Sequence, residues 1–298
     1  MRRRFITLDV FTRRRFTGNP LGMVFDSDGL DTQAMQNIAR EFNYSETVFI
    51  APPRDAGHRA AMRIFTPSSE LPFAGHPTVG AAVGLARAAG DREQSFVIAE
   101  KIGPVVCDVR MHDAGSGFAE FKLPQLPQAA GDLPEPAILA AGLGLAPGDI
   151  DVKAFPPSRW SAGVPFAIVA VNSLEAAGRA RPSGEAFTQA FGQGGPAKAY
   201  VVCEEAAEAG HQLHVRMFAP GIGVAEDPAT GSALAAFSGL YVAHKRPADG
   251  VHKLAIEQGY EMGRPSVLHL TLDVEGGKLR EAAIGGDAIV VTEGAIDA

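Results

Sequence analysis

Three ionisable side chains lie at matched positions of an internal sequence repeat. At these positions the two copies of the repeat carry different residue types. Glu46 opens an apolar run, and the matching position in the second copy is Ala199. His76 in the first copy is matched by Asp227 in the second. Two copies kept only for packing would have little reason to carry different ionisable groups at matched positions. Because a carboxylate or an imidazole can accept and return a proton, these residues predict general acid/base chemistry.

His76 and Asp227 each precede a proline that opens a run of small apolar residues, at Pro77 and Pro228. Proline is well tolerated at the first helical position, so we expect two helices with His76 and Asp227 as their N-caps. A helix N-terminus carries unpaired N–H groups and roughly half a positive charge, so two such ends directed into one cleft would bind a carboxylate without arginine. The alternative is that both residues have only structural roles. Asp227 would then be an N-cap that stabilises its helix by about 1 kcal/mol, and His76 would be a loop histidine.

Glu46 begins a β-like run, where strand propensity does not favour a carboxylate. If Glu46 points into a cleft between domains, desolvation would raise its pKa toward the range useful for proton transfer at neutral pH. The alternative is a solvent-facing strand end without a chemical role.

The elements that position these residues belong to an internal repeat. The segment Arg63-Ile64-Phe65-Thr66-Pro67 matches Arg216-Met217-Phe218-Ala219-Pro220, and further matched segments follow in the same order. We therefore predict two similar domains, residues 1–123 and 137–298, joined by a proline-rich linker at 124–136.

The periodicity within each half indicates strands mixed with helices. Alternating and β-branched runs predict strands at residues 5–10, 21–25, 48–51 and 62–65. Asp31 begins a segment whose apolar residues recur at helical spacing, so this helix should lie on a sheet. The segments after Pro77 and Pro228 are apolar nearly all round, which is typical of helices enclosed by a curved sheet.

The 298-residue chain has a formal net charge of −7 and a mean hydropathy of +0.04. This charge argues against nucleic acid as a partner, because such binding requires clustered Lys and Arg. No apolar run reaches the length of about 20 residues that a membrane span needs, so we expect a cytoplasmic protein without a membrane partner. Cys107 and Cys203 lie in separate β-like runs and predict buried thiols, and no ligand spacing predicts a metal site.

Five segments resemble, in order from end to end, the motifs of PhzF-like proteins, a branch of the diaminopimelate-epimerase fold superfamily. They are Phe16-Thr17-Gly18-Asn19-Pro20, Tyr44-Ser45-Glu46-Thr47, Phe73-Ala74-Gly75-His76-Pro77-Thr78, Glu226-Asp227-Pro228-Ala229-Thr230-Gly231-Ser232-Ala233 and Gln258-Gly259-Tyr260-Glu261-Met262-Gly263-Arg264-Pro265-Ser266.

The resemblance implies an α+β fold of two pseudo-symmetric domains, each a β-barrel-like sheet wrapped around a central helix. It also implies an active site between the domains and, as the usual assembly, a homodimer. Racemases and epimerases of this fold act through paired cysteines near the two helix starts. Because Cys107 and Cys203 lie elsewhere in the sequence, a two-thiol mechanism is excluded.

The activity that the resemblance implies is that of a cofactor-independent and metal-independent isomerase, similar to trans-2,3-dihydro-3-hydroxyanthranilate isomerase. Such an enzyme moves a proton on a small anionic substrate, with Glu46 as the general acid/base. His76 and Asp227 complete the implied catalytic set. The implied substrate-binding residues are Ser45, Gly75, Gly231, Ser232 and Asn19.

Two other classes of protein remain as alternatives. A non-catalytic small-carboxylate binding or regulatory protein would keep the fold, but Glu46 disfavours it because a negative charge weakens the binding of an anion. A metal-dependent enzyme using His76 and Asp227 lacks a supporting ligand cluster. No feature of the sequence identifies the substrate, its stereochemistry or a role in phenazine synthesis.

Overall fold

The computed structural model describes residues 1–298, which divide into two compact units. Unit 1 comprises residues 1–124 and 284–298, and unit 2 comprises residues 125–283. The C-terminal segment therefore belongs with the N-terminal half of the chain. Residues 124–136, expected as a linker, contain strand β9 (Gln128–Asp132), which pairs with β10 (Ser158–Ser161). The proline-rich composition is compatible with this strand because Pro127 only precedes it and removes no N–H from its ladder.

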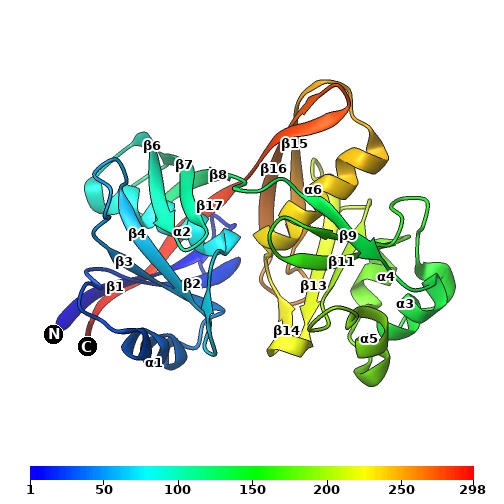
Figure 1. Ribbon diagram of the computed structural model, residues 1–298, viewed down its shortest axis with the longest axis horizontal. Helices are drawn as coiled ribbons and strands as arrows, with labels where there is room; N and C mark the ends of the chain where they lie inside the picture. The colour runs from blue at the N-terminus through cyan, green and yellow to red at the C-terminus, as the bar shows by residue number, and fades with distance from the viewer. The chain divides into compact units, whose positions relative to one another are not determined.

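Unit 1 is a closed β-barrel (Figure 1). In the order of pairing its strands are β1 (Arg2–Val10), β2 (Asn19–Val24), β3 (Glu46–Ala51), β4 (Ala60–Phe65), β6 (Glu93–Glu100), β7 (Gly103–Met111), β8 (Ser116–Lys122) and β17 (Lys278–Asp297). The ladder between β17 and β1 closes the barrel. The pairs β2 with β3 and β4 with β6 are parallel, and the short strand β5 (Glu70–Leu71) extends from β4.

Helix α2 (Gly75–Ala89) runs through this barrel, as Figure 1 shows, and is buried from residue 75 to residue 86. Its small residues are required by the space available. A Cβ atom on Gly84 would lie 2.5 Å from the sulfur of Met23, and one on Gly80 would meet Leu21. The prediction of a helix enclosed by a curved sheet is therefore confirmed.

The predicted start of this helix was wrong. It begins at Gly75 with Ala74 as its N-cap, so His76 lies within the first turn and does not cap the helix. Pro77 is tolerated there because the N–H groups of the first turn have no intrahelical acceptor.

Unit 2 repeats this order of elements. After β9 and β10 its strands are β11 (Pro165–Val171), β12 (Ala199–Cys203), β13 (Leu213–Ala219), β14 (Val224–Asp227), β15 (Gly250–Gln258) and β16 (Ser266–Glu275). The parallel ladders between β11 and β12 and between β13 and β15 correspond to the two parallel ladders of unit 1. Helix α6 (Gly231–Lys245) is the counterpart of α2 and is largely buried. The predicted α+β fold of two pseudo-symmetric, barrel-like domains is confirmed.

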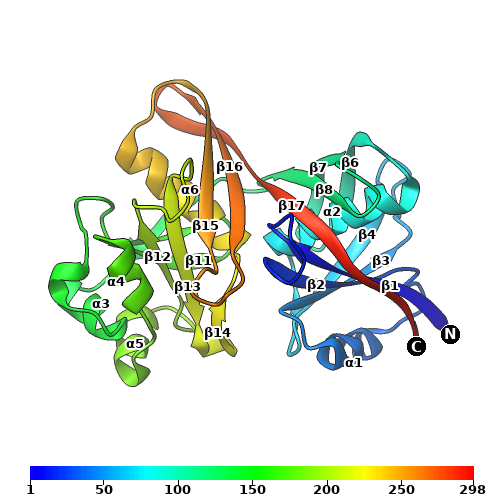
Figure 2. The same cartoon turned by 180° about the vertical axis from the view of Figure 1, so that it is seen from behind.

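The remaining helices cover the outer faces of each unit (Figure 2). In unit 1, the carboxylate of Asp31 accepts a hydrogen bond from the Ala34 N–H and caps α1 (Thr32–Phe42), whose Met35 and Ala39 pack on a cluster formed with β2, β3 and β4. In unit 2, a second apolar cluster joins β11 and β12 to three short helices. These helices are α3 (Pro136–Gly142), α4 (Leu174–Arg179) and α5 (Gly184–Phe191).

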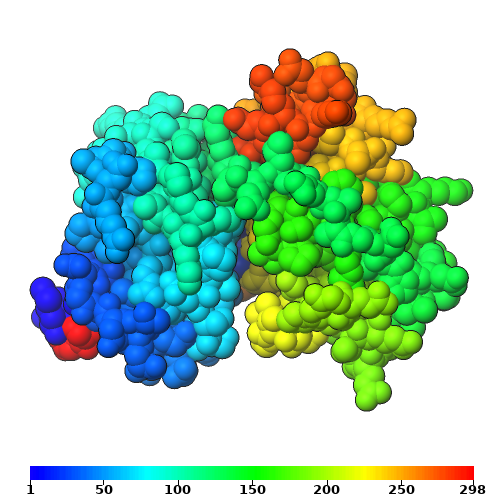
Figure 3. All heavy atoms as spheres, in the orientation of Figure 1, coloured from blue at the N-terminus to red at the C-terminus, as the bar shows by residue number.

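The turn from β16 into β17 is exposed on the surface of unit 2 (Figure 3). Gly276 and Gly277 both have positive φ, 58° and 68°, as a two-residue hairpin turn of this kind requires. Both of their N–H groups donate to the Asp249 carboxylate at 3.0 Å. None of the helices of the chain combines the length and the apolar character needed to cross a lipid bilayer.

Candidate active site

Glu46 and His76 lie side by side in unit 1. Glu46 is the first residue of β3, where the parallel ladder pairs it with Leu21 of β2. His76 is the second residue of the enclosed helix α2. Glu46 Oε2 and His76 Nε2 are 3.4 Å apart, and the two side chains are 16% and 5% exposed. The structure therefore brings two of the predicted catalytic residues into contact and shields them from bulk water.

The His76 imidazole is neutral at physiological pH. Burial lowers the pKa of His76 to about 3, although a hydrogen bond to the Pro20 backbone opposes the shift. A neutral imidazole has one N–H donor and one acceptor nitrogen, and the donor is used by the Pro20 carbonyl. The nitrogen facing Glu46 is then the acceptor. A proton carried by Glu46 can be shared with His76, whereas an ionised Glu46 can accept a proton from a substrate.

The predicted binding residues of unit 1 flank this pair. Asn19 is completely buried at the start of β2, directly before the Pro20 that binds the His76 ring. Gly75 is the first residue of α2, and Ala74 before it supplies no side-chain cap. Ser45 precedes Glu46 and is partly exposed.

Asp227 organises a second polar group, in unit 2. It is the last residue of β14 and is 9% exposed. The Thr230 hydroxyl donates a short hydrogen bond to Asp227 Oδ2. The fully buried Gln258 accepts from the Thr230 N–H at 3.0 Å, and its amide N–H group donates to the Asp227 carbonyl at 2.8 Å. The Thr230 side chain thus contacts the Asp227 carboxylate directly, and the Gln258 side chain binds the backbone on both sides of it.

The expectation that Asp227 is the N-cap of α6 was wrong. The helix begins at Gly231, and Thr230 is its N-cap residue. The Gln258 amide N–H group donates to the Asp227 carbonyl, which would accept the first intrahelical hydrogen bond if Asp227 were the N-cap. The predicted binding residues Gly231 and Ser232 are the first two residues of α6, and no side chain caps the helix ahead of them.

A chain of charged and titratable side chains that sequence reasoning missed lies beside this group, with Glu257 and His214 buried and His211 and Glu261 partly exposed. Glu257, fully buried at the end of β15, accepts hydrogen bonds from His211 at 2.7 Å and from His214 at 3.1 Å. The other ring nitrogen of His214 contacts Glu261 at 2.9 Å. Burial would lower the pKa of His214, but its hydrogen bonds to Glu261 and Glu257 outweigh burial and raise the pKa above its ordinary value. These contacts favour the protonated form of His214.

Arg216 continues this chain of charges toward Asp227. Its guanidinium binds both carboxylate oxygens of Glu226, at 2.8 and 2.9 Å, and donates to backbone carbonyls at the end of α4. Unit 1 contains the corresponding pair, Arg63 with Glu70 at 2.8 Å. Because the pair occurs in both repeats, it stabilises the short strand that precedes each central helix.

Glu100 is another buried carboxyl group that the sequence analysis did not single out. It ends β6, the counterpart of β15, and accepts a hydrogen bond from the Thr78 hydroxyl of α2 at 2.7 Å. Burial raises the pKa of Glu100 to about 8, although the Thr78 hydrogen bond opposes the shift. An acidic residue at the end of both matched strands, Glu100 and Glu257, was the signal that could have found these two sites.

The two cysteines are buried and free, as predicted, in β7 and β12. Burial raises the pKa of the Cys107 thiol far above its ordinary value. No group of three His, Cys, Asp or Glu side chains has an arrangement that could hold a metal ion.

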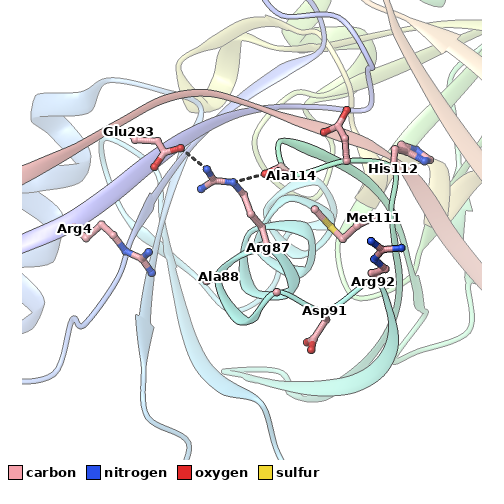
Figure 4. A pocket seen from close by; sticks show the side chains of 11 residues that line it. Arg4, Arg87, Ala88, Asp91, Arg92, Met111, His112, Ala114 and Glu293 are labelled. Carbon is pink, nitrogen blue, oxygen red and sulfur yellow. Dashed lines mark hydrogen bonds and ion pairs between the residues drawn. The ribbon is translucent and has the colours of Figure 1, made fainter.

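A separate pocket of about 670 Å³ surrounds the C-terminal end of α2 in unit 1 (Figure 4). Its charged residues have both signs, and Figure 4 shows Arg87 directed toward Glu293 and the Ala114 carbonyl. Arg4 and Asp91 also line the pocket. None of the predicted site residues contributes to it.

Nearly the whole chain is similar to known proteins of one family. Residues 8–294 match the family described as phenazine biosynthesis-like protein. A protein of Mesorhizobium japonicum described as an uncharacterized isomerase is 49% identical over 296 residues, with 98% of each chain covered. The trans-2,3-dihydro-3-hydroxyanthranilate isomerase of Pseudomonas aeruginosa is 33% identical over 291 residues, again with 98% of each chain covered.

The fold is shared with a solved structure as well. The crystal structure of a phenazine biosynthesis protein of the PhzF family from Bacillus anthracis has a TM-score of 0.88 to this chain at 29% identity, with 100% of both chains covered. These similarities span every predicted site residue.

Proposed function

This chain belongs to the phenazine biosynthesis-like family and is an isomerase, and from that premise we propose that Glu46 is the general acid/base that moves a proton on a small carboxylic acid. The observation that carries the proposal is the 3.4 Å contact between Glu46 and the neutral, buried His76. A carboxylate in a shielded site has lost much of its hydration and is a stronger base than one in water.

The proposed reaction is redox-neutral. The Glu46 carboxylate removes a proton from one carbon of the substrate, the electron pair of that C–H bond shifts through the adjacent double bond, and Glu46 returns the proton to another carbon. His76 Nε2 accepts a hydrogen bond from the protonated Glu46 between the two steps, which stabilises the intermediate form of the enzyme. No electron leaves the substrate, so we propose that neither a cofactor nor a metal is required.

The substrate class follows from the groups proposed to bind it. The N-terminus of α2 at Gly75 and that of α6 at Gly231 and Ser232 both lack side-chain caps, and each can bind one carboxylate through backbone N–H groups. We therefore propose a small unsaturated carboxylic acid. Ser45 and Asn19 are proposed as further contacts near Glu46.

Asp227 is proposed to bind a cationic or hydroxyl group of the same substrate. A carboxylate beside the substrate would repel its acid group, so Asp227 suits an amino or hydroxyl substituent. The substrate in the name of the Pseudomonas aeruginosa relative carries both kinds of group. This compound is the first one to test on the present chain.

The test compares Glu46→Gln with wild-type protein, using trans-2,3-dihydro-3-hydroxyanthranilate as the substrate. Glutamine keeps the shape of the side chain but cannot act as a base, so kcat should fall by about 10²- to 10⁴-fold while substrate still raises the melting temperature. Glu93→Gln is the matched control, because Glu93 also begins a strand of unit 1 but is exposed. Near-normal turnover by Glu46→Gln would overturn the proposal. Binding without turnover by the wild-type protein would favour a carboxylate-binding protein.

A further inference from the structure

Asp227 receives a hydrogen bond whose direction is fixed by its neighbours. The Thr230 hydroxyl contacts both Asp227 Oδ2 and the Gln258 amide nitrogen, the latter at 2.9 Å. The amide nitrogen of Gln258 can only donate, so the Thr230 oxygen accepts that hydrogen bond. The single hydrogen of the Thr230 hydroxyl is then directed to Asp227.

The orientation of the Gln258 amide is itself determined by the backbone. Its oxygen accepts the Thr230 N–H at 3.0 Å, and its nitrogen donates to the Asp227 carbonyl at 2.8 Å. Turning the amide over would place its oxygen against that carbonyl and its N–H group against the Thr230 N–H. Gln258 is fully buried, so no water could compensate for either lost contact.

The backbone after Gln258 is locked to the same turn. Gly259 has φ +79°, and a Cβ atom there would lie 2.6 Å from the Pro228 carbonyl oxygen and 2.5 Å from that of Arg264. Only glycine fits this close approach. This close approach fixes the position of the Gln258 backbone relative to the turn that follows Asp227.

The first repeat folds without this arrangement. Lys101 follows Glu100 at the end of β6 as Gln258 follows Glu257 on β15, and the Thr78 hydroxyl of α2 donates to Glu100 at 2.7 Å, without a glutamine. The barrel and its central helix therefore do not require a threonine and a glutamine at these places. Their presence in unit 2 alone coincides with the presence of Asp227.

We propose that Thr230 and Gln258 are positioning residues that hold Asp227 as an oriented carboxylate for substrate binding. The role of Asp227 rests on the proposed function, but its hydrogen bond does not. A hydrogen bond to an ionised carboxylate favours the charged form, so its removal should make Asp227 easier to protonate. Because hydrogen bonds to charged groups are stronger than those between neutral groups, the removal should raise the titration midpoint of Asp227 by roughly one to two pH units.

The test is a titration of the Asp227 carboxyl by ¹³C NMR in protein labelled at aspartate, with Asp227→Asn used to assign the signal. The midpoint should rise by about one unit or more in Thr230→Val. Thr230→Ser, which keeps the hydroxyl, should titrate as the wild type does. Gln258→Met should move the midpoint in the same direction as Thr230→Val, by a smaller amount.

Ser238→Ala is the matched control. Ser238 is a fully buried hydroxyl on α6 that donates to the Ala235 carbonyl at 2.7 Å, so its loss affects the same helix without touching Asp227. The charged groups on the surrounding elements are unchanged in all of these variants. They are Glu226 on β14, His214 and Arg216 on β13, Glu257 on β15 and Glu261 after it.

The two proposals fail differently. An unchanged midpoint in Thr230→Val, or a change equal to that in Ser238→Ala, would overturn the inference about Thr230 and Gln258. A shifted midpoint combined with normal turnover by Asp227→Asn would support the hydrogen bond and refute the proposed role of Asp227 in the reaction. With both proposals correct, Thr230→Val should lower kcat/KM by roughly tenfold or more, and Thr230→Ser should restore it.

Discussion

Replacing His76 with asparagine should change how the stability of the protein depends on pH. The pKa of His76 is 6.5 in the unfolded chain and about 3 in the folded protein, because burial disfavours the charged ring. Between these values the unfolded state binds more protons than the folded state. The stability that the neutral, buried ring contributes is therefore complete above pH 6.5 and is lost as pH falls toward 3.

The expected size of the effect follows from this window. One pKa unit corresponds to about 1.4 kcal/mol, so the folded protein should lose about 3 kcal/mol between pH 6.5 and pH 4.5 through His76 alone. His76→Asn keeps a donor for the Pro20 carbonyl but does not titrate. The variant should be less stable than wild type at pH 7, and the difference between the two proteins should shrink by about 3 kcal/mol at pH 4.5.

The assay is urea unfolding at a series of pH values, followed by circular dichroism and by hydrogen exchange of the unit 1 amides, since two units need not unfold together. Comparing each variant with wild type cancels the contributions of other groups. His58→Asn, at a partly exposed histidine of the same unit, is the control. Parallel curves for wild type and His76→Asn across this range would refute the neutral, buried state of His76.

Three further predictions concern other buried groups and the cofactor requirement. The pKa of Glu100 is raised to about 8 in the folded protein, so the folded state binds more protons than the unfolded state between pH 4.5 and 8. The wild-type protein should therefore lose stability as pH rises through this range. Glu100→Gln does not titrate, so in thermal melts it should gain stability relative to wild type over the same range. Arg216→Ala removes a guanidinium that is only 7% exposed and leaves the partly buried Glu226 without its partner, so it should cost about 3 kcal/mol in unfolding experiments. Arg63→Ala removes a guanidinium that is 35% exposed and should cost about 1 kcal/mol or less. Equal losses would contradict the difference in burial between the two guanidinium groups. Turnover should persist after dialysis against a chelator, and a loss that zinc or magnesium restores would contradict the cofactor-independent reaction.

Two similar domains and their enclosed helices could be predicted because the repeat and the composition of those helices are visible in the sequence, whereas the barrel-like form of each domain was implied by the resemblance to PhzF-like proteins. Matched segments such as Arg63–Pro67 and Arg216–Pro220 lie on corresponding strands, β4 and β13. The small residues after Pro77 and Pro228 do form the enclosed helices. A helix enclosed by a barrel has no polar face over its buried part. The pattern of apolar residues in the sequence therefore predicts the enclosure directly.

The starts of those helices could not be predicted in the same way. The Asp227 carbonyl, which would accept the first intrahelical hydrogen bond of a helix capped by Asp227, instead accepts one from Gln258, which is distant in sequence. Local capping rules read the Asp-Pro pair as a helix start, but a long-range hydrogen bond overrides them. Strand β9, within residues 124–136, could not be predicted for a similar reason, since its pairing with β10 is a tertiary contact.

The candidate site was predicted in part. Glu46 and His76 were chosen because they differ between the repeats, and they are in contact. The neutral state of His76 follows from its burial in the barrel and has no sequence signature. The chain of charges from His211 to Glu261 was missed because its carboxylates, on β15 and in the segment after it, are far in sequence from His214 on β13.

The central claim, that Glu46 both removes and returns the proton, is tested most directly by the isotope content of the product formed in D₂O. With one base in a shielded site, some of the original hydrogen should be carried by Glu46 from the first carbon to the second. The product isolated after a single turnover should then contain less than one deuterium at the new C–H position, as measured by mass spectrometry and NMR. Complete deuterium incorporation at that position would contradict the account, because it requires a second base or free exchange of Glu46 with solvent.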